Sequence, residues 1–217
     1  MRSADLQLKN FIEEQLALDP ILDAAAIGVS CRDAVVTLHG NVACFSERYA
    51  AEETVMSIRG VRALVNDLEV RLPVENERRD EDIARTAASI LLWHSAIPED
   101  RIGIEVSAGW ITLRGEVDWH YQRVAAERSI RDLMGVRGVS NQIAVVNKEL
   151  KVEIRERIHE ALKRNAMMNA HGLKVELADN KAVLSGTVQI LQRREEAERA
   201  AWNVPGITEV ENKIRVA

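Results

Sequence analysis

The sequence predicts an α+β fold of three tandem αββαβ domains, each a three-stranded mixed sheet with two helices on one face. Three observations predict it. The first is an internal repeat, because residues 28–70, 103–145 and 174–216 align without a gap. The second is an alternation of apolar residues before the repeated glycines, which is typical of strands. The third is an apolar stripe at helical spacing in the segments that precede and follow each predicted strand pair in the sequence.

Each copy carries the same ordered set of punctuating residues. A strand ends in glycine, a second glycine with a β-branched residue after it follows twenty residues later, and an asparagine comes six residues after that. The sets are Gly40, Gly60-Val61 and Asn66; Gly115, Gly135-Val136 and Asn141; and Gly186, Gly206-Ile207 and Asn212. These copies indicate duplication of one unit, with expected domains at 4–73, 80–147 and 150–217.

Each copy begins with an amphipathic helix, a strand and a tight turn. The apolar helix positions are Leu8, Phe11, Ile12 and Leu16; Ile83, Ala87, Ile90 and Leu91; and Ile154, Ile158 and Leu162. Apolar alternation predicts strands over 27–31, 102–106 and 173–177. Gly109 and Asn180 tolerate positive φ and predict tight turns, whereas Ala34 in the first copy predicts a different turn.

The second helix has the clearest pattern in each copy. Its apolar positions are Ala51, Val55 and Ile58; Ala126, Ile130 and Leu133; and Ala197, Ala201 and Val204. The second glycine ends this helix in a left-handed conformation, and the asparagine opens the third strand. Because a helix connects strands two and three, they are expected to pair in parallel. The uncovered sheet face of such a small unit is expected to pack on a neighbouring copy.

An arginine and a glutamate recur four residues apart on the second helix. The pairs are Arg48 and Glu52, Arg123 and Glu127, and Arg194 and Glu198. Solvated ion pairs of this spacing contribute about 0.3–0.5 kcal/mol each. We interpret them as structural, and a shared functional site is the alternative.

Composition and charge exclude several classes of protein. The net charge of −5 argues against a nucleic-acid partner, since such binding requires a basic surface. The chain has no apolar stretch of about 18 residues for a membrane span. Its N-terminus lacks the pattern of a secretory signal, so a cytoplasmic location is expected, or a periplasmic one if a leader was removed. Cys31 and Cys44 are expected to be reduced.

No pattern of catalytic residues stands out. The histidines are His39, His94, His120, His159 and His171, and none has metal-ligand spacing with Cys, Asp or Glu. A nucleophile elbow, a phosphate loop and a dinucleotide fingerprint are all missing from the sequence. We therefore predict that the protein is not an enzyme and has no catalytic residue, metal or cofactor. His120 aligns with Phe45 and Leu191, which predicts a half-buried packing residue.

The repeated pattern resembles the BON domain, the bacterial OsmY and nodulation domain. The residues that carry the resemblance are Leu38-x-Gly40-x-Val42, Arg48-x-x-Ala51-Glu52, Gly60-Val61 and Asn66-x-Leu68-x-Val70, with their equivalents in the other copies. The resemblance covers essentially the whole chain. It implies an αββαβ fold, no enzymatic activity and a role in envelope or osmotic stress, often at phospholipid surfaces. Other BON proteins bind potassium or assist other proteins. This sequence differs from periplasmic members in lacking a leader, and it has three copies without a partner module.

The aromatic residues are unevenly distributed and indicate where binding is to be sought. Those of the second copy are Trp93, Trp110, Trp119 and Tyr121, and its basic residues include Arg114, Arg123, Arg128 and Arg131. Trp119 aligns with apolar residues and is expected in the core. Trp110 is expected on the open sheet face, where it either packs on the next copy or binds externally, and Tyr121 is expected to be exposed.

The candidate binding residues are therefore Trp110, Tyr121, Arg123 and Arg114. Amphipathic rings and nearby cations suit an anionic phospholipid surface, which is our first hypothesis for a non-catalytic, stress-associated binding protein. The alternatives are a protein-interaction or chaperone-like module with a protein partner, and small-ion (potassium) sensing.

Overall fold

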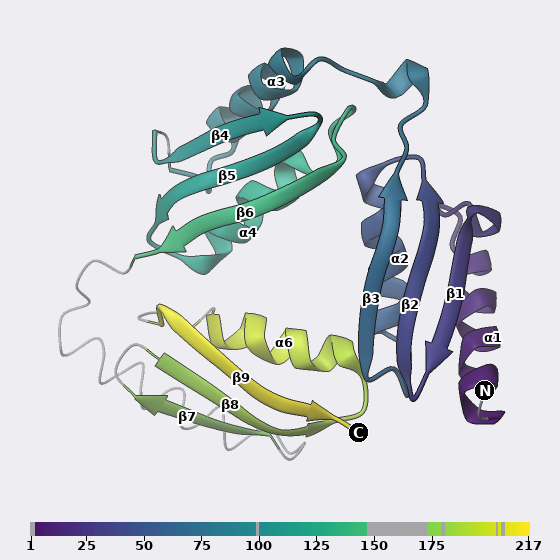
Figure 1. Ribbon diagram of the computed structural model, residues 1–217. Helices are drawn as coiled ribbons and strands as arrows, with labels where there is room; N and C mark the ends of the chain where they lie inside the picture. The colour runs from purple at the N-terminus through teal and green to yellow at the C-terminus, as the bar shows by residue number, and fades with distance from the viewer. Residues whose placement is uncertain (1–2, 99, 147–172, 179–180, 203, 205–206) are drawn as a thin grey trace.

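The computed structural model describes residues 3–98, 100–146, 173–178, 181–202, 204 and 207–217, and it confirms the predicted fold class (Figure 1). The first copy contains α1 (Ser3–Leu18), β1 (Ile27–Arg32), β2 (Val35–Val42), α2 (Phe45–Met56) and β3 (Ala63–Val70). The second contains α3 (Asp80–Trp93), β4 (Ile102–Ser107), β5 (Trp110–Val117), α4 (His120–Ile130) and β6 (Gly138–Val145). The third contains β7 (Lys174–Ala178), β8 (Lys181–Val188), α6 (Leu191–Trp202) and β9 (Glu209–Val216). The helix predicted from Ile154, Ile158 and Leu162 lies outside the described residues.

Each sheet has the predicted mixed topology. The strand orders are β1-β2-β3, β4-β5-β6 and β7-β8-β9. The first pair in each sheet is antiparallel and the second is parallel. The parallel pairing follows from the helical crossover, which returns the chain to the same end of the sheet.

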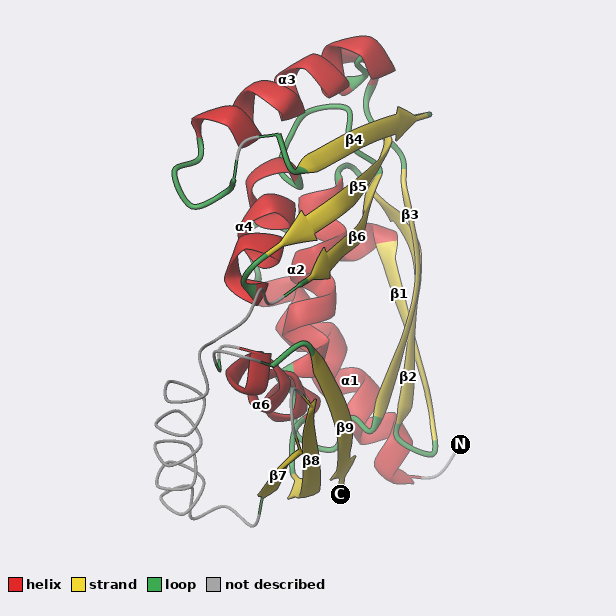
Figure 2. Ribbon diagram, turned by 90° about the vertical axis from the view of Figure 1, so that its left-hand side faces the viewer, coloured by secondary structure: helices red, strands yellow, loops and turns green. Residues whose placement is uncertain are grey.

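Two helices cover one face of each of the first two sheets, as predicted (Figure 2). In the first copy, Val36 and Leu38 of β2 are buried against the α2 residues Ala51 and Val55. The prediction that Phe11 belongs to the core is wrong, because its side chain is 48% exposed. The buried line of α1 runs instead through its neighbours at 12 and 16, which an i, i+4 spacing satisfies without residue 11.

The first glycine of each copy has a steric role inside the strand. Gly40 and Gly115 have φ of +119° and +139°, and a Cβ at either would clash with a carbonyl oxygen, of Ala26 and Arg101 respectively. The strands nevertheless continue two residues beyond the glycine, so the prediction that they end there is wrong. The predicted position of the asparagines is also wrong, since each is the fourth residue of its strand and not the first.

The hairpin turn of the first copy has the same conformation as that of the second, contrary to prediction. Asp33 and Ala34 have φ of 51° and 65°, and Ala108 and Gly109 have φ of 50° and 78°. Two consecutive positive φ values define the turn that matches the twist of a two-residue hairpin. Ala34 therefore adopts a left-handed conformation that the alanine itself disfavours.

A carboxylate on the first helix stabilises this turn in both copies. Asp5 is buried and accepts hydrogen bonds from the backbone N–H groups of Asp33 and Ala34, both at 3.2 Å. Asp80 accepts from the equivalent turn amides of the second copy, at 2.7 and 2.8 Å. These charge-assisted bonds offset the strain at Ala34 and explain why no glycine is needed there.

The repeated asparagine, arginine and glutamate form a bridge between helix and strand. The amide Nδ2 of Asn66, Asn141 and Asn212 donates to a glutamate Oε2 on the second helix at 2.9, 3.0 and 3.0 Å. Each Asn Oδ1 accepts from the backbone two residues later in its own strand. Within the described part of the chain, the predicted arginine–glutamate ion pairs do not form, and each glutamate accepts a hydrogen bond from the asparagine amide. We still interpret these residues as structural, but the partner of the glutamate is the asparagine and not the arginine.

The copies meet through their second helices and not through their sheet faces (Figures 1 and 2). The start of α2 contacts the end of α4: the Arg131 guanidinium lies 4.0 Å from the centre of the Tyr49 ring, and Ser46 donates to Asp132 at 2.7 Å. The start of α4 contacts the end of α6, where His120 stacks on Trp202 with ring centres 4.8 Å apart. Helices α2 and α6 are also in contact. The expectation that an open sheet face packs on a neighbour is therefore wrong, since helix–helix contacts join the copies.

Candidate functional site

The four candidate residues lie on two opposite sides of the second copy. Trp110 and Arg114 alternate with the buried residues of β5 and so project from the open sheet face. Tyr121 and Arg123 belong to α4, which covers the other face. The sequence places all four candidates in one copy, but the sheet of that copy separates Trp110 and Arg114 from Tyr121 and Arg123.

Trp110 is 45% exposed and packs within its own sheet. Its partner across the parallel pair is Gly138, where a Cβ would clash with the indole ring. The ring therefore covers a glycine of the neighbouring strand, which gives it a structural role on the open face. Nearly half of the residue's surface remains accessible.

Arg114 already has acceptors for its guanidinium. Its Nη1 donates to Glu105 Oε2 at 2.7 Å and its Nε donates to Gln142 Oε1 at 3.1 Å. Both side chains of the ion pair are exposed, so the pair contributes at most about 1 kcal/mol. An incoming anion at this point would nevertheless compete with a carboxylate that is already bound.

On the helical side, Tyr121 is 51% exposed, as expected. Arg123 is half-buried, and its backbone carbonyl accepts from Asn141 at 2.9 Å. His120 is half-buried, as predicted from its repeat position. Burial, followed by the Arg123 charge, lowers the pKa of His120 to about 4, so the ring that stacks on Trp202 is neutral at pH 7. Trp119 is half-buried and not in the core as predicted, because it is the residue preceding α4.

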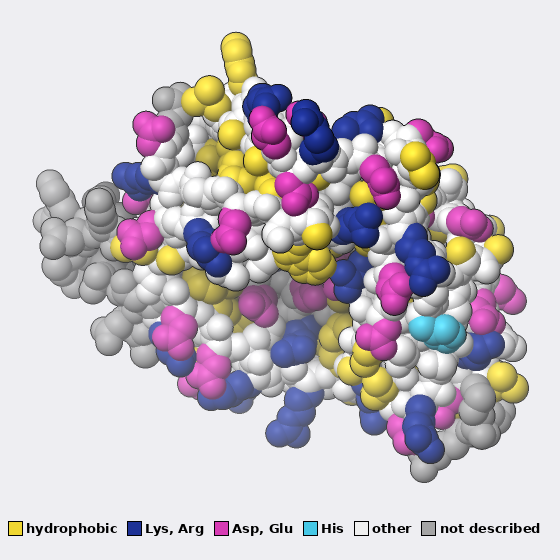
Figure 3. Space-filling model, turned by 45° about the horizontal axis from the view of Figure 1, so that its top comes forward, with side chains coloured by type: hydrophobic (Ala, Val, Ile, Leu, Met, Phe, Trp, Pro, Cys, Tyr) yellow, Lys and Arg dark blue, Asp and Glu magenta, His cyan; other side chains and the backbone are white. Residues whose placement is uncertain are grey.

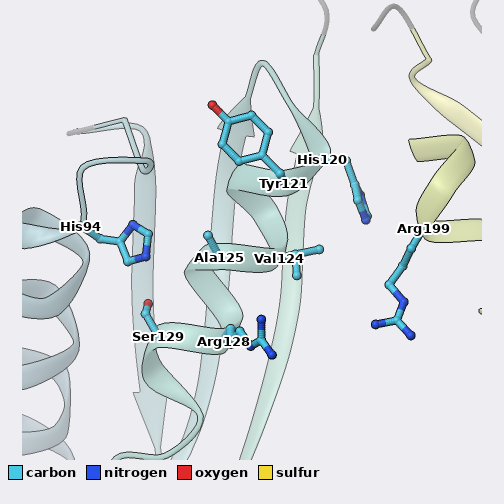
Figure 4. Close-up of a pocket in the computed structure, with 8 residues that line it drawn as sticks. All are labelled: His94, His120, Tyr121, Val124, Ala125, Arg128, Ser129 and Arg199. Atoms are coloured by element: carbon cyan, nitrogen blue, oxygen red, sulfur yellow. The ribbon is translucent and has the colours of Figure 1, made fainter. Parts of the chain in front are cut away.

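A pocket of about 420 Å³ lies beside α4 and contains one of the four candidates (Figure 4). Its lining residues come from the end of α3, the length of α4, and α6 of the third copy. They are His94, His120, Tyr121, Val124, Ala125, Arg128, Ser129 and Arg199. Sequence reasoning missed His94 and Arg199 as pocket residues, because no local pattern indicates that they lie beside the same helix.

Two arginines give the pocket its charge. Figure 4 shows that Arg128 extends from α4 and Arg199 from α6, toward each other across the pocket. Among the described residues, neither guanidinium has an ion-pair partner within 4.0 Å or a side-chain hydrogen bond. Glu195 interacts electrostatically with Arg199 but does not line the pocket. The pocket therefore presents two cations beside an apolar wall.

Other kinds of site find no support in the described residues. No group of three His, Cys, Asp or Glu side chains in that part of the chain is arranged to hold a metal ion. No described helix has the length and apolar character needed to cross a bilayer. Figure 3 shows basic and acidic side chains interspersed over one face of the molecule, without a large patch of either sign. Cys31 and Cys44 are free thiols, as expected.

The solved structures that are similar to the chain at low identity include the following three. Two are of CdsD, a structural protein of the type III secretion system of Chlamydia trachomatis. One has 13% identity and a TM-score of 0.25, covering 97% of this chain and 92% of that one. The other, its C-terminal domain, has 13% identity, a TM-score of 0.27 and full coverage of both chains. The third is the PrgH periplasmic domain, with 9% identity, a TM-score of 0.22 and coverage of 88% and 95%. At TM-scores this low, these similarities carry no argument about function.

The family assignment rests on the sequence comparison. No curated protein matches the chain significantly. The BON domain matches three times, over residues 4–71, 79–147 and 151–217, which together span nearly the whole sequence. The glycines, the helical stripe and the asparagine bridge of each copy lie within these matched ranges. The chain belongs to the BON domain family.

Proposed function

We propose that the protein is a non-catalytic, stress-associated binding protein whose second BON domain contacts anionic phospholipid surfaces. One observation carries the proposal: among the described residues, every exposed tryptophan and tyrosine lies in the second copy. These are Trp93, Trp110 and Tyr121, which are 85%, 45% and 51% exposed. BON domains are associated with stress-related or membrane-associated binding, which agrees with this proposal.

The helical side of the second copy suits such a surface better than its open sheet. The end of α3 lies beside α4, and His94, next to Trp93, lines the same pocket as Tyr121. Within the described part of the chain, no carboxylate pairs with Arg123 or Arg128 on α4, whereas Glu105 pairs with Arg114 on the sheet. Aromatic rings with a polar edge favour the membrane interface, and each basic residue near an anionic surface contributes about 1 kcal/mol.

Co-sedimentation with phosphatidylglycerol vesicles tests the proposal. We expect the wild type to bind and the double variant Tyr121→Ala, Arg123→Glu to lose most of this binding. The matched control is Phe11→Ala, Arg59→Glu, which removes an exposed aromatic and reverses an exposed charge in the first copy. Circular dichroism checks that each variant is folded. Absence of binding by the wild type, or equal loss in both double variants, would overturn the proposal.

The open sheet faces favour a second candidate function, a protein-interaction module. Those of the first two copies look to the same side of the molecule (Figures 1 and 2) and retain the exposed residues Val35, Val65 and Trp110. Capture of a defined protein partner that is lost with Trp110→Ala, without vesicle binding, would select this function.

A further inference from the structure

We propose that the pocket between α4 and α6 binds the phosphate group of a small organic anion. The lipid-contacting surface proposed above consists of Trp93, Tyr121, Arg123 and Arg128 of the second copy. The pocket goes beyond that surface because it also requires Arg199 of the third copy. It is therefore a property of two BON domains together and not of either one alone.

The charge of the pocket carries the first step of the argument. Arg128 and Arg199 occupy the same repeat position in successive copies, and both extend into one pocket (Figure 4). Two cations that line one pocket repel each other, and a bound dianion removes that repulsion. The planar guanidinium donates paired N–H groups, a geometry that matches phosphate oxygens. The first copy has Glu53 at this position, so α2 does not offer the same charge.

His94 lines the pocket on the side of α4 away from Arg199 (Figure 4), and its Nδ1 accepts a hydrogen bond from the backbone N–H of Ala96 at 3.4 Å. Ser129 adds no donor, because its hydroxyl donates to the Ala126 carbonyl at 2.9 Å. The donors available to an anion bound between α4 and α6 are therefore the two arginines.

The remaining lining suits an apolar body attached to the phosphate. Val124 and the His120 ring, which is neutral at pH 7, lie on the same side of α4 as Arg199 (Figure 4), and Ala125 and Tyr121 line the rest of the pocket. A volume of about 420 Å³ lies within the range of small-molecule sites. A phosphate ester with an aromatic or aliphatic group would thus contact both kinds of wall, whereas inorganic phosphate would contact only the donors.

Titration calorimetry of the full chain with phenyl phosphate and with inorganic phosphate tests the proposal. We expect phenyl phosphate to bind the wild type more tightly than inorganic phosphate does. Arg128→Gln and Arg199→Gln are each expected to weaken phenyl phosphate binding about tenfold or more, since each removes a charge-assisted contact. Arg193→Gln is the matched control, because Arg193 is an exposed arginine of the same helix that does not line the pocket. It is expected to leave binding unchanged.

A vesicle arm distinguishes a soluble ligand from a lipid headgroup. Binding of phenyl phosphate that is lost in both pocket variants supports the site with a soluble phosphate ester as its ligand. Binding only to phosphatidylglycerol vesicles, lost in the same two variants and retained in Arg193→Gln, supports it with the headgroup as the source of the phosphate. Vesicle binding that Arg199→Gln leaves unchanged, with no soluble probe bound, overturns the pocket but not the lipid-contacting surface. Absence of binding in both arms overturns both proposals.

Discussion

The second helices of the first and second copies occupy the same place in the fold but present different residues. At the first helical position, Phe45 packs against the core of the second copy, while His120 stacks on Trp202 of the third. One turn later, Tyr49 of α2 lies under the guanidinium of Arg131, whereas the equivalent residue of α4, Val124, lines a pocket. Helix α2 therefore uses its outer face for contact with the next copy, and α4 leaves part of that face accessible.

This difference shows which residues a duplicated domain can vary. The glycine that allows close approach and the asparagine bridge recur in each copy, because the fold of a single copy requires them. The outer face of the second helix does not contribute to its own core, so it can diverge toward docking or toward binding. The following variants test that division between shared fold and divergent surface.

The largest effect is expected at the strand glycine that both copies share. Gly115→Ala places a Cβ against the Arg101 carbonyl oxygen at φ +139°, and we expect a loss of about 3 kcal/mol or more in the free energy of unfolding. Gly40→Ala should behave alike. Gly103→Ala is the control, since its Cβ would meet only an ordinary contact at 3.8 Å. Urea unfolding measures all three, and equal stability of Gly115→Ala and Gly103→Ala would contradict the close approach.

The asparagine bridge is expected to give the next largest effect. Asn141→Ala leaves the Arg123 carbonyl and the Glu127 carboxylate without the amide donor, and should cost about 2 kcal/mol of unfolding free energy. Asn66→Ala should cost a similar amount, because the bridge is shared. The adjacent exposed Gln142→Ala should change stability by less than about 0.5 kcal/mol. Comparable effects for Asn141 and Gln142 would mean that the bridge does not stabilise the fold.

The histidine at position 120 is expected to make the stability of the protein depend on pH, which the equivalent Phe45 of the first copy cannot do. His120 has its pKa lowered from 6.5 to about 4 in the folded protein, so it contributes a loss of stability as the pH falls from about 6.5 to 4. His120→Phe introduces the residue of the first copy, which retains a ring for stacking without titrating. The variant should lose less stability than the wild type between pH 7 and 4.5 in chemical unfolding.

Glu195 acts in the opposite direction, because burial, followed by the Glu53 charge, raises its pKa. Glu195 titrates in both the wild type and His120→Phe, so the difference between their pH profiles isolates the effect of residue 120. Identical profiles would refute the lowered pKa of His120.

The smallest effect is expected at the hairpin turn. Ala34 has φ of 65°, and Ala34→Gly should raise the unfolding free energy by about 0.5 kcal/mol, because relief of the left-handed strain exceeds the added entropy of the unfolded chain. Gly109→Ala should be destabilising, since its Cβ would lie 2.6 Å from the Gly135 carbonyl oxygen. Thermal unfolding distinguishes the two directions. A destabilised Ala34→Gly would show that the alanine is not strained.

Local spacing was sufficient to predict the strand order, the parallel pairing and most of the helical stripe. It was insufficient where two positions satisfy the same periodicity, as with Phe11 and Ile12. It also failed at Ala34, because the carboxylate that stabilises the turn lies 29 residues earlier in the chain. The role of Asn66 could not be predicted, since its partner depends on which turn of the helix faces the strand.

The sequence by itself determined the repeat, the fold of each copy and the family, because glycine positions and apolar periodicity act within a single unit. It also indicated the second copy as the place where the residues differ. Only the tertiary structure decided how the copies meet and which residues share a pocket. Arg128 and Arg199 lie in different domains, and no local pattern expresses the packing of α4 on α6 that brings them to one site.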